Sequence, residues 1–163
     1  MATRAIIGYY LHHKHEISAK ASWKGVYVHF GEPSMLGEEL YKRLIMSDEN
    51  VKKLIDTHKC GFSIFPTKPY YEDNCNYFTN KSINVTVKQK YGGHIYQFSE
   101  ITFIDWLYLF NMYEKRLNVF NIKIVEHTTT KKDIYEPKIK LVKSISYLKD
   151  YNINWEKIDV ERY

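Results

Sequence analysis

Several side chains capable of chemistry meet at one strand-to-helix turn. Residues 24–40 read KGVYVHFGEPSMLGEEL, an alternating strand followed by a turn and the start of a helix. His29, Gly31 and Glu32 lie in the turn, and Arg4 lies on the strand expected before it. A helix N-terminus carries unpaired N–H groups that bind anions, and an arginine adds bidentate contacts to phosphate. We therefore predict that these four residues bind a small anionic ligand.

A structural role explains the same turn without any ligand. His29 and Glu32 would then cap the helix or bond loop backbone, and Arg4 would form a surface ion pair. The glycine and the proline form the strand-to-helix turn itself, so they need no ligand in either case. Both interpretations stay open at the level of sequence.

The basic C-terminal segment, residues 128–163, is the second candidate site. Four of its lysines are predicted to form a partner or nucleic-acid surface: Lys131, Lys132, Lys138 and Lys140. Aromatic residues lie among them, and rings between basic groups suit single-stranded nucleic acid. A solvated amphipathic face is the simpler alternative. Tyr70 and Tyr71, in a long loop expected over residues 67–80, are predicted to add exposed aromatic contacts.

No familiar catalytic pattern is present in the chain. It lacks a nucleophile elbow, a Walker loop, a His-Glu-x-x-His motif and a glycine-rich dinucleotide fingerprint. His13 and His15 have a spacing that can hold a metal, but solvated histidines at a hairpin tip are commoner, so we predict no metal site. Cys60 and Cys75 are predicted to be reduced thiols. We predict no cofactor and favour a non-enzymatic protein, although acid–base chemistry by a Glu/His pair stays open.

Size and composition indicate one domain spanning residues 1–163. Hydrophobic residues make up 44% of the chain and charged residues 26%, as is ordinary for a globular protein. The net charge of +5 favours anionic partners, although an AT-rich genome would also enrich lysine. The N-terminus has no signal-peptide pattern and no segment reaches transmembrane length, so we expect a cytoplasmic protein with no membrane partner.

The pattern of apolar residues predicts an α+β fold built on an antiparallel β-sheet. Alternating segments predict a first hairpin over residues 3–30. Apolar stripes predict two consecutive helices after this hairpin, over residues 35–45 and 48–59, with Ser47 or Asp48 capping the second.

The second half of the chain predicts two more hairpins. One turns at Gly92-Gly93, between alternating segments, and the other turns near residues 113–115. Residues 138–151 can form an amphipathic helix or an extended strand, and the helix is favoured.

The first part of the chain resembles a family of small bacteriophage and prophage proteins. Members begin with a Met-(Ala)-Thr-Arg strand, and this chain begins MATRAIIGYY. Members carry a His-Trp-Asp-Gly-Tyr-Pro turn before a helix with a glycine near its start; His29, Pro33 and Gly37 match that pattern. Here Phe-Gly-Glu replaces Trp-Asp-Gly-Tyr, so the aspartate of the turn is absent or replaced by Glu32.

Two later segments extend this resemblance. GFSIF at residues 61–65 lies where members have a Ser-Ser-Leu segment, and WLYLFNMYEKRLNVFN at residues 106–121 matches their closing hairpin. The match does not reach the basic C-terminal segment. The family has no established activity, so the resemblance implies a phage accessory protein that acts in the host-cell cytoplasm.

Phage accessory proteins tend to disable or redirect host systems, and three functions by binding follow. The first is capture of a small anionic, nucleotide-like host defence signal at the turn. The second is inhibition of a host protein through a Tyr-rich and basic surface. The third is a nucleic-acid-binding module. A single chain does not predict an oligomeric state.

Overall fold

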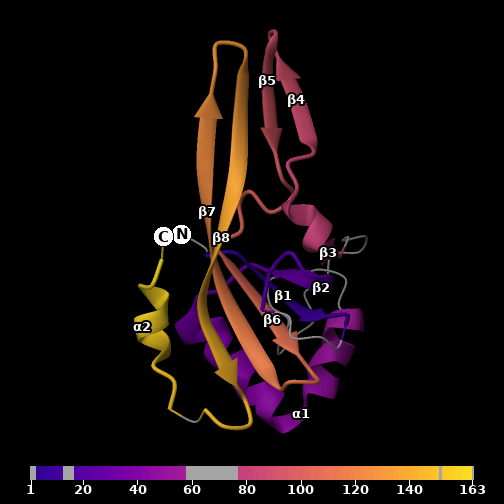
Figure 1. Cartoon of the computed structure of the whole chain (residues 1–163), viewed down its shortest axis with the longest axis vertical. Coiled ribbons are helices and arrows are strands. Elements are labelled where there is room, and N and C mark those ends of the chain that lie inside the picture. The colour runs from indigo at the N-terminus through magenta and orange to yellow at the C-terminus, as the bar shows by residue number, and fades with distance from the viewer. Residues whose placement is uncertain (1–2, 13–16, 58–76, 151, 163) are drawn as a thin grey trace.

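The computed structural model describes residues 3–12, 17–57, 77–150 and 152–162. Within these residues one sheet has the strand order β3-β2-β1-β6-β7-β8-β5-β4 (Figure 1). Its strands are β1 (Ala5–Tyr10), β2 (Trp23–Val28), β3 (Phe78–Thr79), β4 (Val87–Tyr91), β5 (His94–Phe98), β6 (Trp106–Asn111), β7 (Arg116–Thr128) and β8 (Lys132–Ser146). The α+β class is thus confirmed.

The sheet is mixed, so the prediction of a purely antiparallel sheet is wrong. The first hairpin pairs β1 with β2, and the two later hairpins pair β4 with β5 and β6 with β7, all antiparallel as predicted. The pairs β1·β6 and β5·β8 are parallel. Parallel strands cannot be joined by a tight turn, and each of these pairs joins segments that are distant in sequence. No local turn signal in the sequence could therefore have predicted these two parallel pairs.

The helical region after β2 is one long helix, so the prediction of two consecutive helices is also wrong. A π-helical turn, η1 (Pro33–Gly37), leads directly into α1 (Glu38–Thr57). Ser47 leaves helical geometry, with φ −169° and ψ 105°, and its hydroxyl accepts a hydrogen bond from the Asn50 N–H at 3.2 Å. The cap expected between two helices is therefore present as a kink within α1.

The C-terminal segment forms a strand where a helix was favoured. Residues 132–146 are β8, which pairs antiparallel with β7 from Arg116↔Ser146 to Thr128↔Asp133. A short helix, α2 (Trp155–Asp159), follows and packs on η1. Of the loop predicted over 67–80, residues 67–76 lie outside the described residues, while 78–79 form β3 and Asn80–Ile83 form a 3₁₀ turn, η2.

Apolar side chains pack on both faces of the sheet in the lower part of the molecule. One cluster joins α1 and α2 to alternate residues of the central strands, including Ile7, Tyr108 and Phe110. The second cluster, including Trp23 and Leu107, lies on the opposite face beneath η2 and the loops. No helix in the described part of the chain is long and apolar enough to cross a membrane.

Two hairpins project from this packed region. Figure 1 shows β4/β5 beside the far ends of β7 and β8, joined to them by the parallel β5·β8 pairing. We call residues 87–98 and 123–140 the arm, and the remaining described residues the body. None of the residues of β4 or β5 is buried. Within the arm, β4 and β5 are therefore open to solvent on both faces, whereas Ile124, Pro137 and Ile139 of β7 and β8 are at least partly buried.

Candidate functional site

Lysines occupy one face of the arm. Side chains alternate between the two faces of a strand, and register partners on adjacent strands share a face. Leu117 and Val119 of β7 belong to the apolar cluster beneath α1. Lys123 follows Val119 at an even spacing on the same strand, so Lys123 and its register partner Lys138 lie on that same face of the sheet. We call this side of the arm the lysine face; it comprises Lys88, Lys90, Lys123, Lys132, Lys138 and Lys140.

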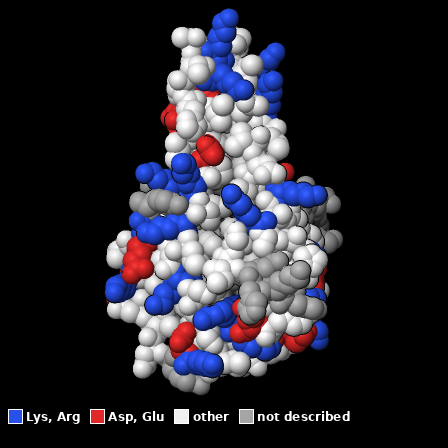
Figure 2. All heavy atoms as spheres, in the orientation of Figure 1, with Lys and Arg blue, Asp and Glu red and all other residues white. Residues whose placement is uncertain are grey.

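Three strands, β4, β7 and β8, carry these lysines, and β5 lies between β8 and β4. Lys132 of β8 is the register partner of Ile95 of β5, which in turn is the partner of Lys90 of β4. The run from Lys132 to Lys140 covers about 26 Å at roughly 3.3 Å per residue. In Figure 2, Lys and Arg side chains gather toward the end of the arm on the side that faces the viewer.

The lysine face carries almost no compensating negative charge. Lys88, Lys90, Lys123, Lys132 and Lys138 form no ion pair with any residue that the structure describes. By strand alternation Glu136 is the acidic residue of this face, and it contacts the His127 Nε2 at 3.2 Å. The surface can therefore attract a partner with closely spaced negative charges.

The predicted turn site is held together by contacts within the protein. The Gly31 N–H donates to the Thr3 carbonyl at 2.7 Å, and the Tyr108 hydroxyl donates to the Gly31 carbonyl at 2.6 Å. The Thr3 hydroxyl donates to the Glu32 Oε1 at 3.0 Å. His29 Nδ1 lies 2.9 Å from the Tyr27 hydroxyl. Each of these contacts fits the structural interpretation of the turn.

The start of the helix already has an anionic partner. The Ser34 N–H donates to the Asp159 Oδ1 at 2.9 Å, which brings a carboxylate of α2 to the position expected for a bound anion. The Glu32 side chain makes no capping hydrogen bond, although its carbonyl accepts from the Met35 and Leu36 N–H groups. Arg4 is exposed and its backbone N–H donates to Asp105. Ligand binding at this turn stays a prediction.

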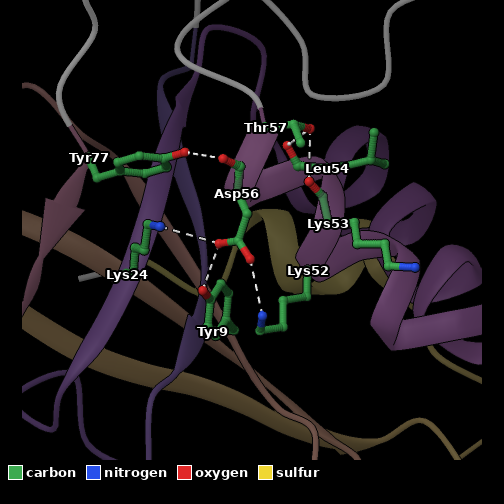
Figure 3. Close-up of polar contacts among 8 residues, drawn as sticks. All are labelled: Tyr9, Lys24, Lys52, Lys53, Leu54, Asp56, Thr57 and Tyr77. Atoms are coloured by element: carbon green, nitrogen blue, oxygen red, sulfur yellow. Dashed lines mark hydrogen bonds and ion pairs between the residues drawn. The ribbon is translucent and has the colours of Figure 1, made fainter.

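Sequence reasoning missed a polar cluster at the C-terminal end of α1 (Figure 3). The Asp56 Oδ1 accepts from the Tyr9 hydroxyl at 2.7 Å and from Lys24 at 3.3 Å, and its Oδ2 accepts from Lys52 at 3.1 Å. The Tyr77 hydroxyl donates to the Asp56 carbonyl. The Asp56 carboxylate joins β1 and β2 to α1, and the Asp56 backbone carbonyl joins the segment before β3 to the same helix.

Proton affinities argue against acid–base chemistry in this cluster at neutral pH. Burial and the hydrogen bond to Asp56 raise the pKa of Tyr9 well above its usual value, so the phenol stays protonated. Partial burial opposes ionisation of Asp56, but hydrogen bonds from Tyr9, Lys52 and Lys24 outweigh it and lower the pKa of that carboxyl. At neutral pH Asp56 is therefore charged and the Tyr9 phenol is neutral, and the hydrogen bond between them joins α1 to β1.

Asp48, a buried carboxylate, has a role comparable to that of Asp56. It accepts from Lys115 at 2.7 Å and from the Tyr147 hydroxyl at 2.7 Å, which ties α1 to the β6–β7 turn and to the end of β8. Burial and the contact with Asp48 raise the pKa of Tyr147. Among the described residues, no group of three or more His, Cys, Asp or Glu side chains could hold a metal ion. His13 and His15 lie outside the described residues.

The structure places three of the four predicted basic residues on one face and adds three further lysines to that face. Lys132, Lys138 and Lys140 share the lysine face, and Lys131 lies in the turn that ends the arm. Sequence reasoning missed Lys88, Lys90 and Lys123. The i, i+2 spacing of lysines in VKQKY, before the Gly92-Gly93 turn, was a usable signal for a basic strand face. Tyr70, Tyr71, Cys60 and Cys75 lie outside the described residues.

In comparisons with known proteins, no family model, curated protein or solved structure matches this chain. The structure itself shows an α+β body with a basic two-hairpin arm. The resemblance to small phage proteins stays a prediction.

Proposed function

We propose that this protein binds nucleic acid through the lysine face of its arm. The observation that carries the proposal is the direct cross-strand pairing of Lys123 with Lys138, flanked by further lysines on the same face. Like charges directly opposite each other on a sheet destabilise the pair. A ribbon that served only as structure would gain from a carboxylate at one of these two positions.

The dimensions of the face also suit a phosphate backbone. Its length of about 26 Å corresponds to roughly eight base pairs at 3.4 Å per base pair. Lysines on a projecting ribbon can reach phosphates without a clash between the body and the nucleic acid. Most protein contacts to phosphate carry no sequence information, so this surface by itself supports binding without strong sequence preference.

This proposal takes precedence over the two other predicted functions for specific reasons. Beside the turn of Arg4, His29, Gly31 and Glu32, the Ser34 N–H at the start of the helix already donates to the Asp159 carboxylate, so this N–H is not free for an anionic ligand. Inhibition of a host protein was assigned in part to Tyr70 and Tyr71, on which the structure has no bearing.

The test is the salt dependence of binding. Fluorescence anisotropy with a labelled 20-base-pair duplex, and with one of its strands, is measured between 50 and 200 mM salt. We expect affinity to fall steeply with salt, with a slope of log K against log salt of about −4 to −5 for the duplex if most of the face contacts phosphates. The double variant Lys123→Gln/Lys138→Gln should reduce the slope by about 2.

A matched control separates local contacts from net charge. Lys81 is exposed on η2, which covers the opposite face of the sheet. Lys81→Gln should leave the slope unchanged. No binding at 50 mM salt, or equal slopes for the wild type and the double variant, would overturn the proposal.

A further inference from the structure

The opposite face of the arm carries an open aromatic groove. It is lined by Gln89, Tyr91, Tyr96, Phe98, Thr102, Phe103 and Tyr135 and has a volume of about 630 Å³. Tyr91 is 66% exposed and Phe103 is 70% exposed. These rings cover no core, since the two apolar clusters of the body do not include them. We propose that the groove stacks the bases of a single-stranded nucleic acid, an inference that rests on the proposed function.

Phe103 is held outward by a rigid turn. Thr102 Oγ1 donates to the Ser99 carbonyl at 2.7 Å and accepts from the Ser99 N–H at 3.0 Å. Ile101 and Ile104, on either side of the exposed ring, are buried in the body. The backbone therefore cannot rotate to bury Phe103 without extracting one of its neighbours. A ring fixed in solvent is a stacking platform that loses little conformational freedom when a base covers it.

The rings on the arm are similarly pre-positioned. Tyr96 is the register partner of Gln89, and the Tyr91 and Tyr96 rings lie 5.9 Å apart in an edge-to-face arrangement. His94 also packs against Tyr96, with ring centroids 4.8 Å apart. The geometry leaves the outer surface of Tyr91 accessible at the end of the hairpin.

Strand β4 connects the groove with the lysine face. It is the edge of the sheet, so its side chains point alternately to the two faces with no strand beyond them. Tyr91 faces the groove, and Lys88 and Lys90 point to the lysine face. A single strand that follows this edge can place bases on the rings and phosphates near the two lysines, and charge complementarity thus selects the occupant.

Carboxylates on the groove side determine where the phosphates can run. Glu126 of β7 and Asp133 of β8 lie on the same face of the sheet as the groove. The Asp133 Oδ1 lies 3.3 Å from the His94 Nε2. The two carboxylates would repel phosphates there, so the backbone is expected on the β4 side. A duplex keeps its bases stacked on each other and cannot offer them to these rings, which makes a single strand the ligand that fits both features.

The test compares ring variants on the two forms of nucleic acid. Binding of the labelled 20-nucleotide strand and of the corresponding duplex is measured at one salt concentration. Tyr91→Ala and Phe103→Ala should each weaken binding of the single strand at least about fivefold and leave duplex binding unchanged. Phe103→Tyr keeps the ring and should bind the single strand like the wild type. Tyr113→Ala, an equally exposed tyrosine (60%) at the β6–β7 turn of the body, is the control.

The outcomes separate the two proposals. Loss of single-strand binding in the ring variants alone supports the groove as a base-stacking site. Equal binding of both forms that is unaffected by the ring variants overturns the groove proposal and leaves the lysine face standing. Absence of binding to either form overturns both. If the wild type is a dimer in sedimentation and Phe103→Ala makes it a monomer, the groove is an interface between copies, and the stacking proposal is wrong.

Discussion

The body and the arm belong to the same sheet but obey different physical constraints. In the body, all residues of β1 and β6 are buried, because apolar clusters cover both faces of the sheet. In the arm, β4 and β5 have no buried residue. Packing therefore selects nearly every side chain in the central strands, whereas it leaves most positions of the arm free to be selected by other demands.

The charged residues of the two regions differ in the same way. In the body, Asp48 and Asp56 are surrounded by donors from lysines and tyrosines and link elements that are distant in sequence. In the arm, the cross-strand lysine pair Lys123/Lys138 has no carboxylate opposite it. The two aspartates of the body are thus paired within the fold, whereas Lys123 and Lys138 of the arm form no ion pair with any described residue. The comparison supports the proposal that the arm contacts another molecule.

The largest expected effect tests the packing contrast with two isoleucines. Ile7 of β1 is fully buried, and Ile95 of β5 is half-buried. Ile7→Ala should lower the free energy of unfolding by about 2–5 kcal/mol, because it leaves a cavity in the core. Ile95→Ala should lower it by about 1 kcal/mol, since less apolar surface is lost from contact. Urea denaturation measures both values, and similar losses would break the contrast between body and arm.

An intermediate effect tests the role of Asp56 in the body. Because its pKa is lowered in the folded state, the stability that it contributes is present above its unfolded pKa and is lost as pH falls through the folded value. Asp56→Asn should therefore destabilise by about 1 kcal/mol at pH 7, a modest value because the group is partly exposed.

The wild-type and Asp56→Asn stabilities should converge as the pH falls below 4. Urea denaturation at a series of pH values gives the difference between them. Glu49→Gln, at an exposed position of the same helix, serves as the control and should change stability by less than about 0.5 kcal/mol. A difference that persists unchanged at low pH would show that the charge of Asp56 has no stabilising role.

The smallest expected effect concerns the arm and has the opposite sign. Lys138→Glu replaces a like-charge pair with Lys123 by an opposite-charge pair, which should stabilise the ribbon by about 0.2–1 kcal/mol. Amide hydrogen exchange in β7 and β8 should slow by up to about fivefold. The same substitution should weaken nucleic-acid binding more than Lys138→Gln does. Faster exchange in the variant would show that the lysine pair does not cost the arm stability.

Local signals predicted the hairpins well. Gly92 and Gly93 have φ of +54° and +84°, the left-handed conformations that a tight two-residue hairpin turn requires. The β6–β7 turn lies where it was expected, near residues 113–115, and Lys115 has a φ of 55°. These turns are determined by residues next to each other in the chain, so a single sequence contains the necessary information.

The C-terminal strand and the parallel pairings required information from distant residues. Apolar residues in the segment that became β8 recur at a spacing compatible with a helix. In the structure, the long antiparallel edge of β7 supplies hydrogen bonds along the whole segment, and this pairing outweighs local helix preference. The parallel β5·β8 pairing then fixes the second hairpin beside the first.

The sequence alone determined the α+β class, the antiparallel hairpins, the positive charge and the abundance of aromatic rings. Tertiary structure decided which lysines share a face, because β4, β7 and β8 bring Lys88, Lys123 and Lys138 together from positions up to 50 residues apart. It also placed the Asp159 carboxylate at the predicted anion site. Hairpin turns depend on neighbouring residues, whereas a charged surface depends on strand register, and register is set by pairing across the whole sheet.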